Sequence, residues 1–129
     1  MSGTAFGATI SVGNLTLATG IVVTPPLDSN AELSRMAGVG DVNGDGFDDF
    51  LVGAPSHNTN GLATLVFGRG GGWTNLEVPA AAAPATVDFT VPGIRTGIGI
   101  AVSGLGDVNG DGLADLLVTA PRTSPGDRI

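Results

Sequence analysis

Two short segments of this 129-residue sequence carry oxygen-bearing side chains at the same spacing. Aspartate or asparagine occupies positions one, three, five and nine of residues 41–49, and the same residue types recur 66 residues later in residues 107–115. Across residues 38–55 and 104–121, 13 of 18 positions are identical without a gap. Oxygen ligands at alternate positions of one tight turn can converge on a hard cation such as Ca²⁺. The glycine after the third of them permits the backbone reversal that such a turn needs.

Differences between the two copies separate ligands from their neighbours. Asp48 of the first segment is replaced by Ala114 in the second, so Asp48 is not expected to be a ligand. The seventh position is Phe47 or Leu113, which offers only its main-chain carbonyl. The sequence therefore predicts two Ca²⁺ sites, each built from three carboxylates, one amide and one carbonyl. The predicted metal ligands are Asp41, Asn43, Asp45, Phe47 and Asp49 in the first loop, and Asp107, Asn109, Asp111, Leu113 and Asp115 in the second.

Other classes of site fit the sequence less well. An EF-hand loop closes with a bidentate glutamate at position twelve, but the twelfth residue here is Val52 or Val118. The same valines argue against dockerin-type loops. The glycine-rich residues 68–72 are not followed by Lys-Ser or Lys-Thr, which excludes a P-loop. The alternative of a solvated acidic turn without metal affinity does not explain the position-by-position repetition.

Apolar strands are expected on both sides of each acidic loop. Residues 49–55 and 115–121 begin with a carboxylate, continue as short apolar runs and end in proline, a pattern typical of buried strands. Residues 34–39 and 100–105, which precede the loops, are mixed small and apolar and read as the partner strands. Each predicted ion therefore lies in a loop that joins two adjacent strands.

Further strands are predicted between the two loops. Residues 61–68 form an apolar run after the hairpin-turn signal Asn60-Gly61. Residues 86–91 alternate polar and apolar, which indicates a half-buried outer strand with residues 20–25 as its counterpart one period earlier. The alanine-rich residues 79–85 are bracketed by prolines and are expected to form a surface excursion.

Composition agrees with an all-β chain and restricts its partners. The sequence has 22 glycines, eight prolines and no sustained helical spacing, so turns and short strands should dominate. The net charge is −7, and no lysine is present. Nucleic acid is therefore not an expected partner, because no basic stripe is available to displace counterions. Neither membrane insertion nor a signal peptide is indicated by the sequence.

The loop and the strand after it resemble the FG-GAP repeat, the blade unit of the β-propeller in integrin α subunits and many bacterial surface proteins. The repeat's closing element is complete at Gly53-Ala54-Pro55 and reads Thr119-Ala120-Pro121 in the second copy. The resemblance implies an all-β fold of propeller blades, each a four-stranded antiparallel sheet with a Ca²⁺-binding hairpin loop. Residues 1–129 would form one propeller segment, with a first repeat at 19–68 (loop 41–49) and a second at 85–129 (loop 107–115).

The resemblance also implies a function. The chain would be an extracellular or cell-surface binding and adhesion scaffold for protein or carbohydrate ligands, in which Ca²⁺ is structural, and it would not be an enzyme. The alternative is a non-catalytic appendage of a secreted hydrolase. The extracellular location follows from the metal loops and the family, since weak Ca²⁺ sites fill only outside a cytosol.

Length, histidine and tryptophan add three expectations. About two blades are too few to close a propeller, which needs about four to eight. The chain is therefore either part of a longer propeller or a unit whose homo-oligomer completes the ring. His57, the only histidine, has no second catalytic partner at a suitable spacing and is expected at the surface. Trp73 is expected to cap an apolar blade surface rather than to contact a partner or glycan.

Overall fold

The computed structural model of the chain describes residues 23–25, 32–71, 73, 76–77, 86–91 and 97–121. Within these ranges every regular element is a strand, except for one 3-10 turn at His57–Thr59. The predicted all-β fold is therefore confirmed. The predicted surface excursion at residues 79–85 lies outside the described residues.

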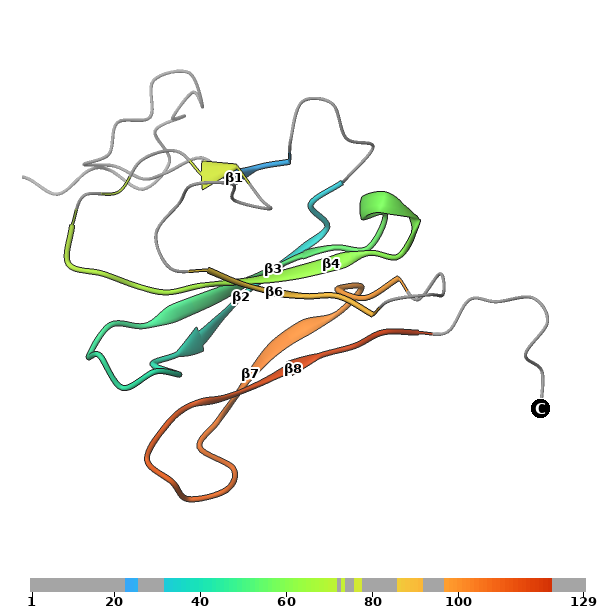
Figure 1. Ribbon diagram of the computed structural model, residues 1–129. Coiled ribbons are helices and arrows are strands. Elements are labelled where there is room, and N and C mark those ends of the chain that lie inside the picture. The colour runs from blue at the N-terminus through green and yellow to red at the C-terminus, as the bar shows by residue number, and fades with distance from the viewer. Residues whose placement is uncertain are drawn as a thin grey trace, which may run out of the picture.

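Four strands form the main sheet, in the order β2-β3-β4-β6. They are β2 (Arg35–Gly40), β3 (Asp49–Ala54), β4 (Leu62–Val66) and β6 (Thr86–Phe89). Each pairs antiparallel with its neighbour in the list, so the chain meanders across the sheet (Figure 1). The first acidic loop joins β2 to β3, as the flanking apolar segments predict.

β3 and β4 are the most buried strands because both of their faces are covered. On one face, Ala54 of β3 packs with Leu62 and Val66 of β4; we call this the β1 side of the sheet, after strand β1 (Val23–Thr24). On the other, Leu51 packs with Val39 and Leu65; we call this the β7 side, after strand β7 (Val102–Gly106). A short apolar run without polar alternation is typical of such a doubly covered strand.

A second hairpin covers the β7 side. Its strands are β7 (Val102–Gly106) and β8 (Asp115–Val118), joined by the second acidic loop. They pair antiparallel with the same register shift near the loop that β2 and β3 show, between Gly104 and Gly106 in β7 and between Gly38 and Gly40 in β2. Figure 1 shows this hairpin on the opposite side of the sheet from β1. The repeated sequence therefore folds into a repeated hairpin.

A short parallel pair covers part of the β1 side. β1 (Val23–Thr24) pairs with β5 (Leu76–Glu77), and Val23 and Leu76 pack with the apolar side chains of β3 and β4. Of the strand predicted over residues 20–25, only 23–25 lie within the described residues. This pair is parallel, although antiparallel sheets are expected, because β2, β3 and β4 lie between β1 and β5 in the sequence and the chain then runs along β1 in the same direction as β1 itself.

The last strand of the main sheet lies at residues that the sequence analysis gives to the second repeat. β6 pairs with β4, with Asp88 opposite Thr64. The Thr64 hydroxyl, which is fully buried, donates a 2.6 Å hydrogen bond to Asp88 Oδ1. The first sheet therefore runs to Phe89, past the predicted repeat boundary at residue 85. The half-buried character predicted for residues 86–91 agrees with the position of β6 at the end of the strand order found among the described residues.

Candidate metal centre

Asp41 organises the first acidic loop. Its Oδ1 accepts hydrogen bonds from the amides of Gly44 (2.7 Å) and Asp45 (3.1 Å), and its Oδ2 accepts one from Gly46 (2.8 Å). Gly44 and Gly46 have φ values of 78° and 88°, a region that other residues seldom adopt. The two glycines therefore let the chain wrap around one carboxylate, and the backbone reversal predicted at Gly46 is present.

Asn43 and Asp45 complete the tip of the loop. Asn43 Oδ1 accepts a hydrogen bond from the Asp45 amide at 3.0 Å, and Asn43 Nδ2 donates to Asp45 Oδ2 at 2.9 Å. Asp45 Oδ1 accepts a hydrogen bond from the Phe47 amide at 2.9 Å. These side chains are exposed, so solvent and ions reach their oxygens directly.

Asp49 closes the loop and is only 1% exposed. Its Oδ2 accepts a hydrogen bond from the Val42 amide at 2.9 Å, and its Oδ1 accepts one from the Gly68 amide at 2.7 Å. A buried carboxylate is tolerated only when it is hydrogen-bonded or paired. Asp49 therefore ties the start of the loop to the chain just beyond β4, a structural role besides that of predicted ligand.

Gly68 is the contributor that sequence reasoning misses. In the sequence it marks only the end of an apolar run, whereas in the structure its amide donates a hydrogen bond to the buried carboxylate of Asp49. A Cβ atom at this position would meet the Asp48 carbonyl and the Phe47 side chain, so the close approach requires glycine. A glycine that ends the second apolar run after such a loop is the signal that could have indicated this contact.

The second loop repeats all seven hydrogen bonds that lie within the first. Asp107 accepts amide hydrogen bonds from Gly110, Asp111 and Gly112 at 2.7, 3.1 and 2.8 Å, and Asp115 accepts one from Val108 at 2.9 Å. The two bonds between Asn109 and Asp111, and the bond from Leu113 to Asp111, are also present, at 2.9–3.0 Å. No distance differs from its counterpart in the first loop by more than 0.1 Å. The conformation is thus encoded by the repeated residues.

The loop amides keep the first carboxylate of each loop charged. The hydrogen bond from Gly46 is the largest influence on the pKa of Asp41, which lies below its ordinary value of 3.8; partial desolvation acts in the opposite direction, and the Gly44 and Asp45 amides lower the pKa further. The pKa of Asp107 is lowered in the same way, with the Gly112 amide as the largest cause. Amide hydrogen bonds favour the ionised form of a carboxylate. Both groups are therefore anionic at neutral pH.

The two loops contact each other at the eighth position of the second. The Ala114 amide donates a 3.0 Å hydrogen bond to the Asp41 carbonyl. A Cβ atom on Gly40 would come within 3.0 Å of the Ala114 Cβ. Packing against the first loop therefore explains why alanine stands here, where the first loop has the exposed Asp48. The same difference sets Asp48 apart from the predicted ligands.

The donors of both loops suit a hard cation in type, since they are carboxylate, amide and carbonyl oxygens. The glycine turns and the charged first carboxylate suit it as well. Among the residues that the structure describes, however, no three carboxylate, histidine or cysteine side chains are grouped closely enough to hold a metal ion. The side chains are turned to amides of their own loop, and the ten-residue ligand set stays a prediction.

Comparison with known proteins identifies the repeat. The FG-GAP repeat family model matches residues 37–66 and 99–127, which contain the two hairpins and their loops. The chain carries FG-GAP repeats. It is 35% identical over 91 residues to integrin alpha-PS2 of Drosophila melanogaster, an alignment of 66% of this chain and 6% of that protein. It is 32% identical over 86 residues to human integrin alpha-6, covering 63% of this chain and 7% of that protein.

These matches set the scale of the resemblance. The chain spans only about 6 to 7% of the length of the integrin subunits it matches. No solved structure matches the chain. The FG-GAP match and the antiparallel sheets place the chain in the β-propeller class, as an open, partial propeller. No helix in the described part of the chain is long and apolar enough to span a membrane.

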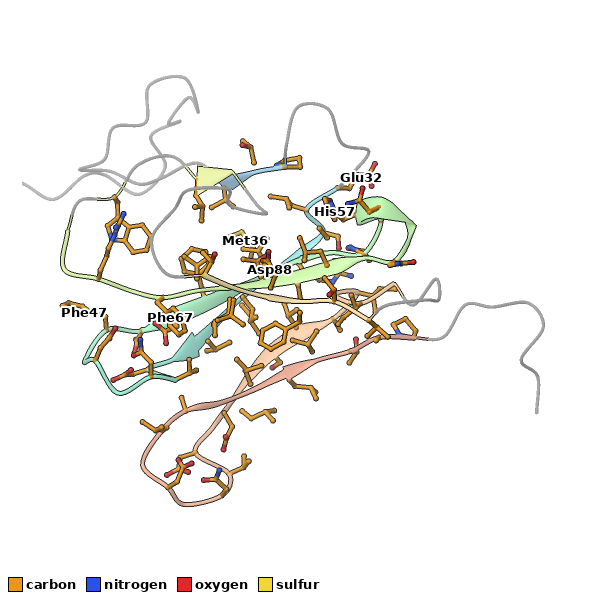
Figure 2. The ribbon with its side chains drawn as sticks, viewed as in Figure 1. Glu32, Met36, Phe47, His57, Phe67 and Asp88 are labelled. Atoms are coloured by element: carbon orange, nitrogen blue, oxygen red, sulfur yellow. The ribbon has the colours of Figure 1, made fainter. Side chains whose placement is uncertain are left out.

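Neither His57 nor Trp73 belongs to the two acidic loops. His57 is in the 3-10 turn between β3 and β4, and Figure 2 shows it at the opposite end of the sheet from Phe47 of the first loop. Its Nε2 contacts the Asn58 side chain at 2.8 Å. Trp73 packs on the β1 side, contacts Phe50 with a ring-centroid distance of 6.3 Å, and lies 4.9 Å from the Arg69 guanidinium. The prediction that Trp73 caps apolar blade surface is confirmed.

Proposed function

We propose that this chain is a calcium-binding β-propeller module of the integrin α type that acts as an extracellular or cell-surface adhesion scaffold. One observation carries the calcium assignment. Two loops that lie 66 residues apart in the sequence have the same carboxylate-centred hydrogen bonds, although, within the described residues, only the first is also bonded to an amide beyond β4, that of Gly68. The integrin matches support the adhesion role.

Charge gives each loop a reason to bind a divalent cation. Three predicted ligand carboxylates lie within nine residues of each loop, and these six account for half of the twelve acidic residues of the chain. Two Ca²⁺ ions would reduce the formal net charge from −7 to −3 (−7 plus 2 × 2). Asp41, Asp45 and Asp49 would hold the ion in the first loop, together with the Asn43 amide and the Phe47 carbonyl. The ion would draw the Asp45 carboxylate from its bond to the Asn43 amide.

The proposed role of the ion is structural. Each loop joins two neighbouring strands, and Asp49 connects the first loop to the end of β4. An ion in the loop would clamp the hairpin and stiffen the blade. Protein or carbohydrate ligands would then bind to loops at the end of the sheet opposite the calcium hairpins, where the turn between β3 and β4 lies. No chemical step is assigned to the module.

Thermal unfolding with and without Ca²⁺ tests the metal assignment. For sites with a Kd of about 10⁻⁴ M, 10 mM Ca²⁺ is about 100 times Kd and adds about 2.7 kcal/mol per site to the free energy of unfolding. We expect a clear rise in the melting midpoint that a chelator reverses. Combined Asp45→Ala and Asp111→Ala should abolish this rise, whereas the matched control Asp48→Ala should retain it. An unchanged midpoint would refute calcium binding, and equal loss in the control would refute the ligand assignment.

A separate assay tests the adhesion role. The calcium-loaded chain is applied to immobilised extracellular-matrix proteins and to a glycan array, and the bound amount is compared with that of the Asp45→Ala, Asp111→Ala variant. We expect calcium-dependent retention on at least one surface. Retention on none would contradict the scaffold role and leave the metal assignment intact.

A further inference from the structure

The two hairpins of this chain have the same sequence pattern but differ in what covers them. Val39 of β2 and Leu51 of β3 are 3% and 0% exposed, because the β7–β8 hairpin packs on them. Their counterparts 66 residues later are Leu105 and Leu117, which are 45% and 47% exposed. We call the surface around Leu105 and Leu117 the outer face of the β7–β8 hairpin. This outer face carries apolar residues at the positions that the β2–β3 hairpin buries against β7 and β8, but here the side chains are exposed.

The covered face shows how such a contact is made. β7 lies along β2 so closely that a Cβ atom on Gly104 would come within 2.8 Å of the Gly38 carbonyl oxygen and the Val39 Cα. Val102 and Leu116 supply the apolar side chains that pack from the hairpin onto the sheet. Glycine in β7 therefore allows the backbones to approach, and the side chains beside it fill the space on either side.

The strand that corresponds to β7 in the first hairpin is β2, and its residues on the side away from β7 are also exposed. Met36 and Gly38 of β2 are the counterparts, by the 66-residue repeat, of Val102 and Gly104 of β7. Met36 is 58% exposed, and a Cβ atom on Gly38 would have no heavy atom within 4 Å. Both residues lie on the β1 side, since Met36 is opposite Val52 and Gly38 is opposite Phe50. Figure 2 shows Met36 on this side of the sheet.

The other elements on the β1 side leave β2 accessible. β1, β5 and Trp73 pack over Ala54 of β3 and Leu62 and Val66 of β4. The internal contact with the second hairpin is made chiefly by β7 against β2. A hairpin docked on β2 from the β1 side would therefore meet the strand that these elements do not cover.

We propose that copies of this chain associate head to tail, with β2 of one copy packed on the outer face of the β7–β8 hairpin of the next. The occupant of the bare face is a second copy, because each copy presents both complementary halves, Met36 with Gly38 at one end and Leu105 with Leu117 at the other. Such a heterologous contact leaves one free half at each end of a dimer, so assembly continues to a ring or a filament. The inference depends on packing and repeat register, and it stands independently of calcium binding.

One difference makes the contact between copies weaker than the internal one. By the repeat, Asp48 of the second copy takes the place of Ala114 and lies over Gly106, next to the acidic second loop. Space is available there, since a Cβ atom on Gly106 would have no heavy atom within 4 Å. The added negative charge opposes the contact. Asp48→Ala therefore strengthens association.

Sedimentation velocity of the full chain over a range of concentrations tests the proposal. We expect species larger than a dimer that dissociate on dilution. Leu117→Asp should weaken association about tenfold or more, because a carboxylate would be buried without a partner. Ile100→Asp is the matched control, since Ile100 is also 47% exposed but its counterpart Ser34 is itself exposed. Gly38→Val should also weaken association, and circular dichroism of each dilute variant checks that it is folded.

Three results would overturn the proposal. A wild-type chain that stays monomeric at every concentration would assign the bare face to a following repeat of a longer chain instead. A dimer that never grows further would indicate a symmetric contact. Equal weakening by Leu117→Asp and Ile100→Asp would show that association depends on general surface hydrophobicity and not on the repeated contact.

Discussion

Gly104 of β7 provides a sharp test of how the two hairpins pack. A methyl group there would lie within 2.8 Å of the Gly38 carbonyl oxygen and the Val39 Cα, both of them main-chain atoms that cannot rotate away. Overpacking of this kind costs about 1–3 kcal/mol. Replacing glycine by alanine also restricts the unfolded chain, which offsets about 0.4–1 kcal/mol. We therefore expect Gly104→Ala to lower the free energy of unfolding by about 1–2 kcal/mol.

The matched variant is Gly38→Ala, at the same position of the first hairpin. A methyl group on Gly38 meets no heavy atom within 4 Å, so the unfolded-state effect alone remains and stability should be unchanged or slightly higher. Urea unfolding, followed by far-ultraviolet circular dichroism, measures both variants. Protein should be dilute, since self-association would add to apparent stability by mass action. Equal stability of the two variants would refute the hairpin packing described above.

Two further predictions concern the acidic loops. The lowered pKa of Asp41 and of Asp107 means that each carboxylate contributes stability that is fully present above the unfolded-state value of 3.8 and is lost as pH falls through the lower folded-state value. Urea midpoints measured from pH 7 to pH 2 in chelator should therefore decline below about pH 4. The combined Asp41→Asn and Asp107→Asn variant should show a smaller decline. A decline as large as that of the wild type would contradict the assignment of this pH dependence to the two carboxylates. Asp49→Ala leaves the Val42 and Gly68 amides without their partner, so it should lower the free energy of unfolding by about 2–4 kcal/mol. This loss should be larger than that caused by Asp115→Ala at the more exposed counterpart. Equal losses in urea unfolding would show that the contact with Gly68 contributes nothing.

The sequence predicts the two hairpins well because local chemistry determines them. Alternating oxygen-bearing residues with glycines at fixed positions favour one loop conformation, and apolar runs on either side favour strands. These local preferences act within about twenty residues, so each copy adopts the same hairpin independently of the other. The strand after the Asn60-Gly61 turn is equally local. β2, β3, β4, β7 and β8 accordingly lie close to the residues predicted for them.

Long-range placement was harder to predict. β6 joins the first sheet through its pairing with β4, which depends on the chain returning after a connection of about twenty residues. The parallel pairing of β1 with β5 likewise has no short-range signal. The hydrogen bond from Gly68 to Asp49 brings together residues 19 positions apart. Such contacts depend on which surfaces become available once the hairpins have formed, and a single sequence does not reveal them.

The hydrogen bond between Ala114 and the Asp41 carbonyl bears on how arrays of this repeat can diverge. The residue at the eighth position of the second loop is constrained by the repeat before it, whereas the predicted ligand positions are constrained by hydrogen bonds within their own loop. Repeats of this kind are consequently not interchangeable modules. Inverting the order of these two in a chimera would set the carboxylate of Asp48 beside the glycine turn of its new neighbour, so the same two hairpins would pack less tightly in that order than in their own.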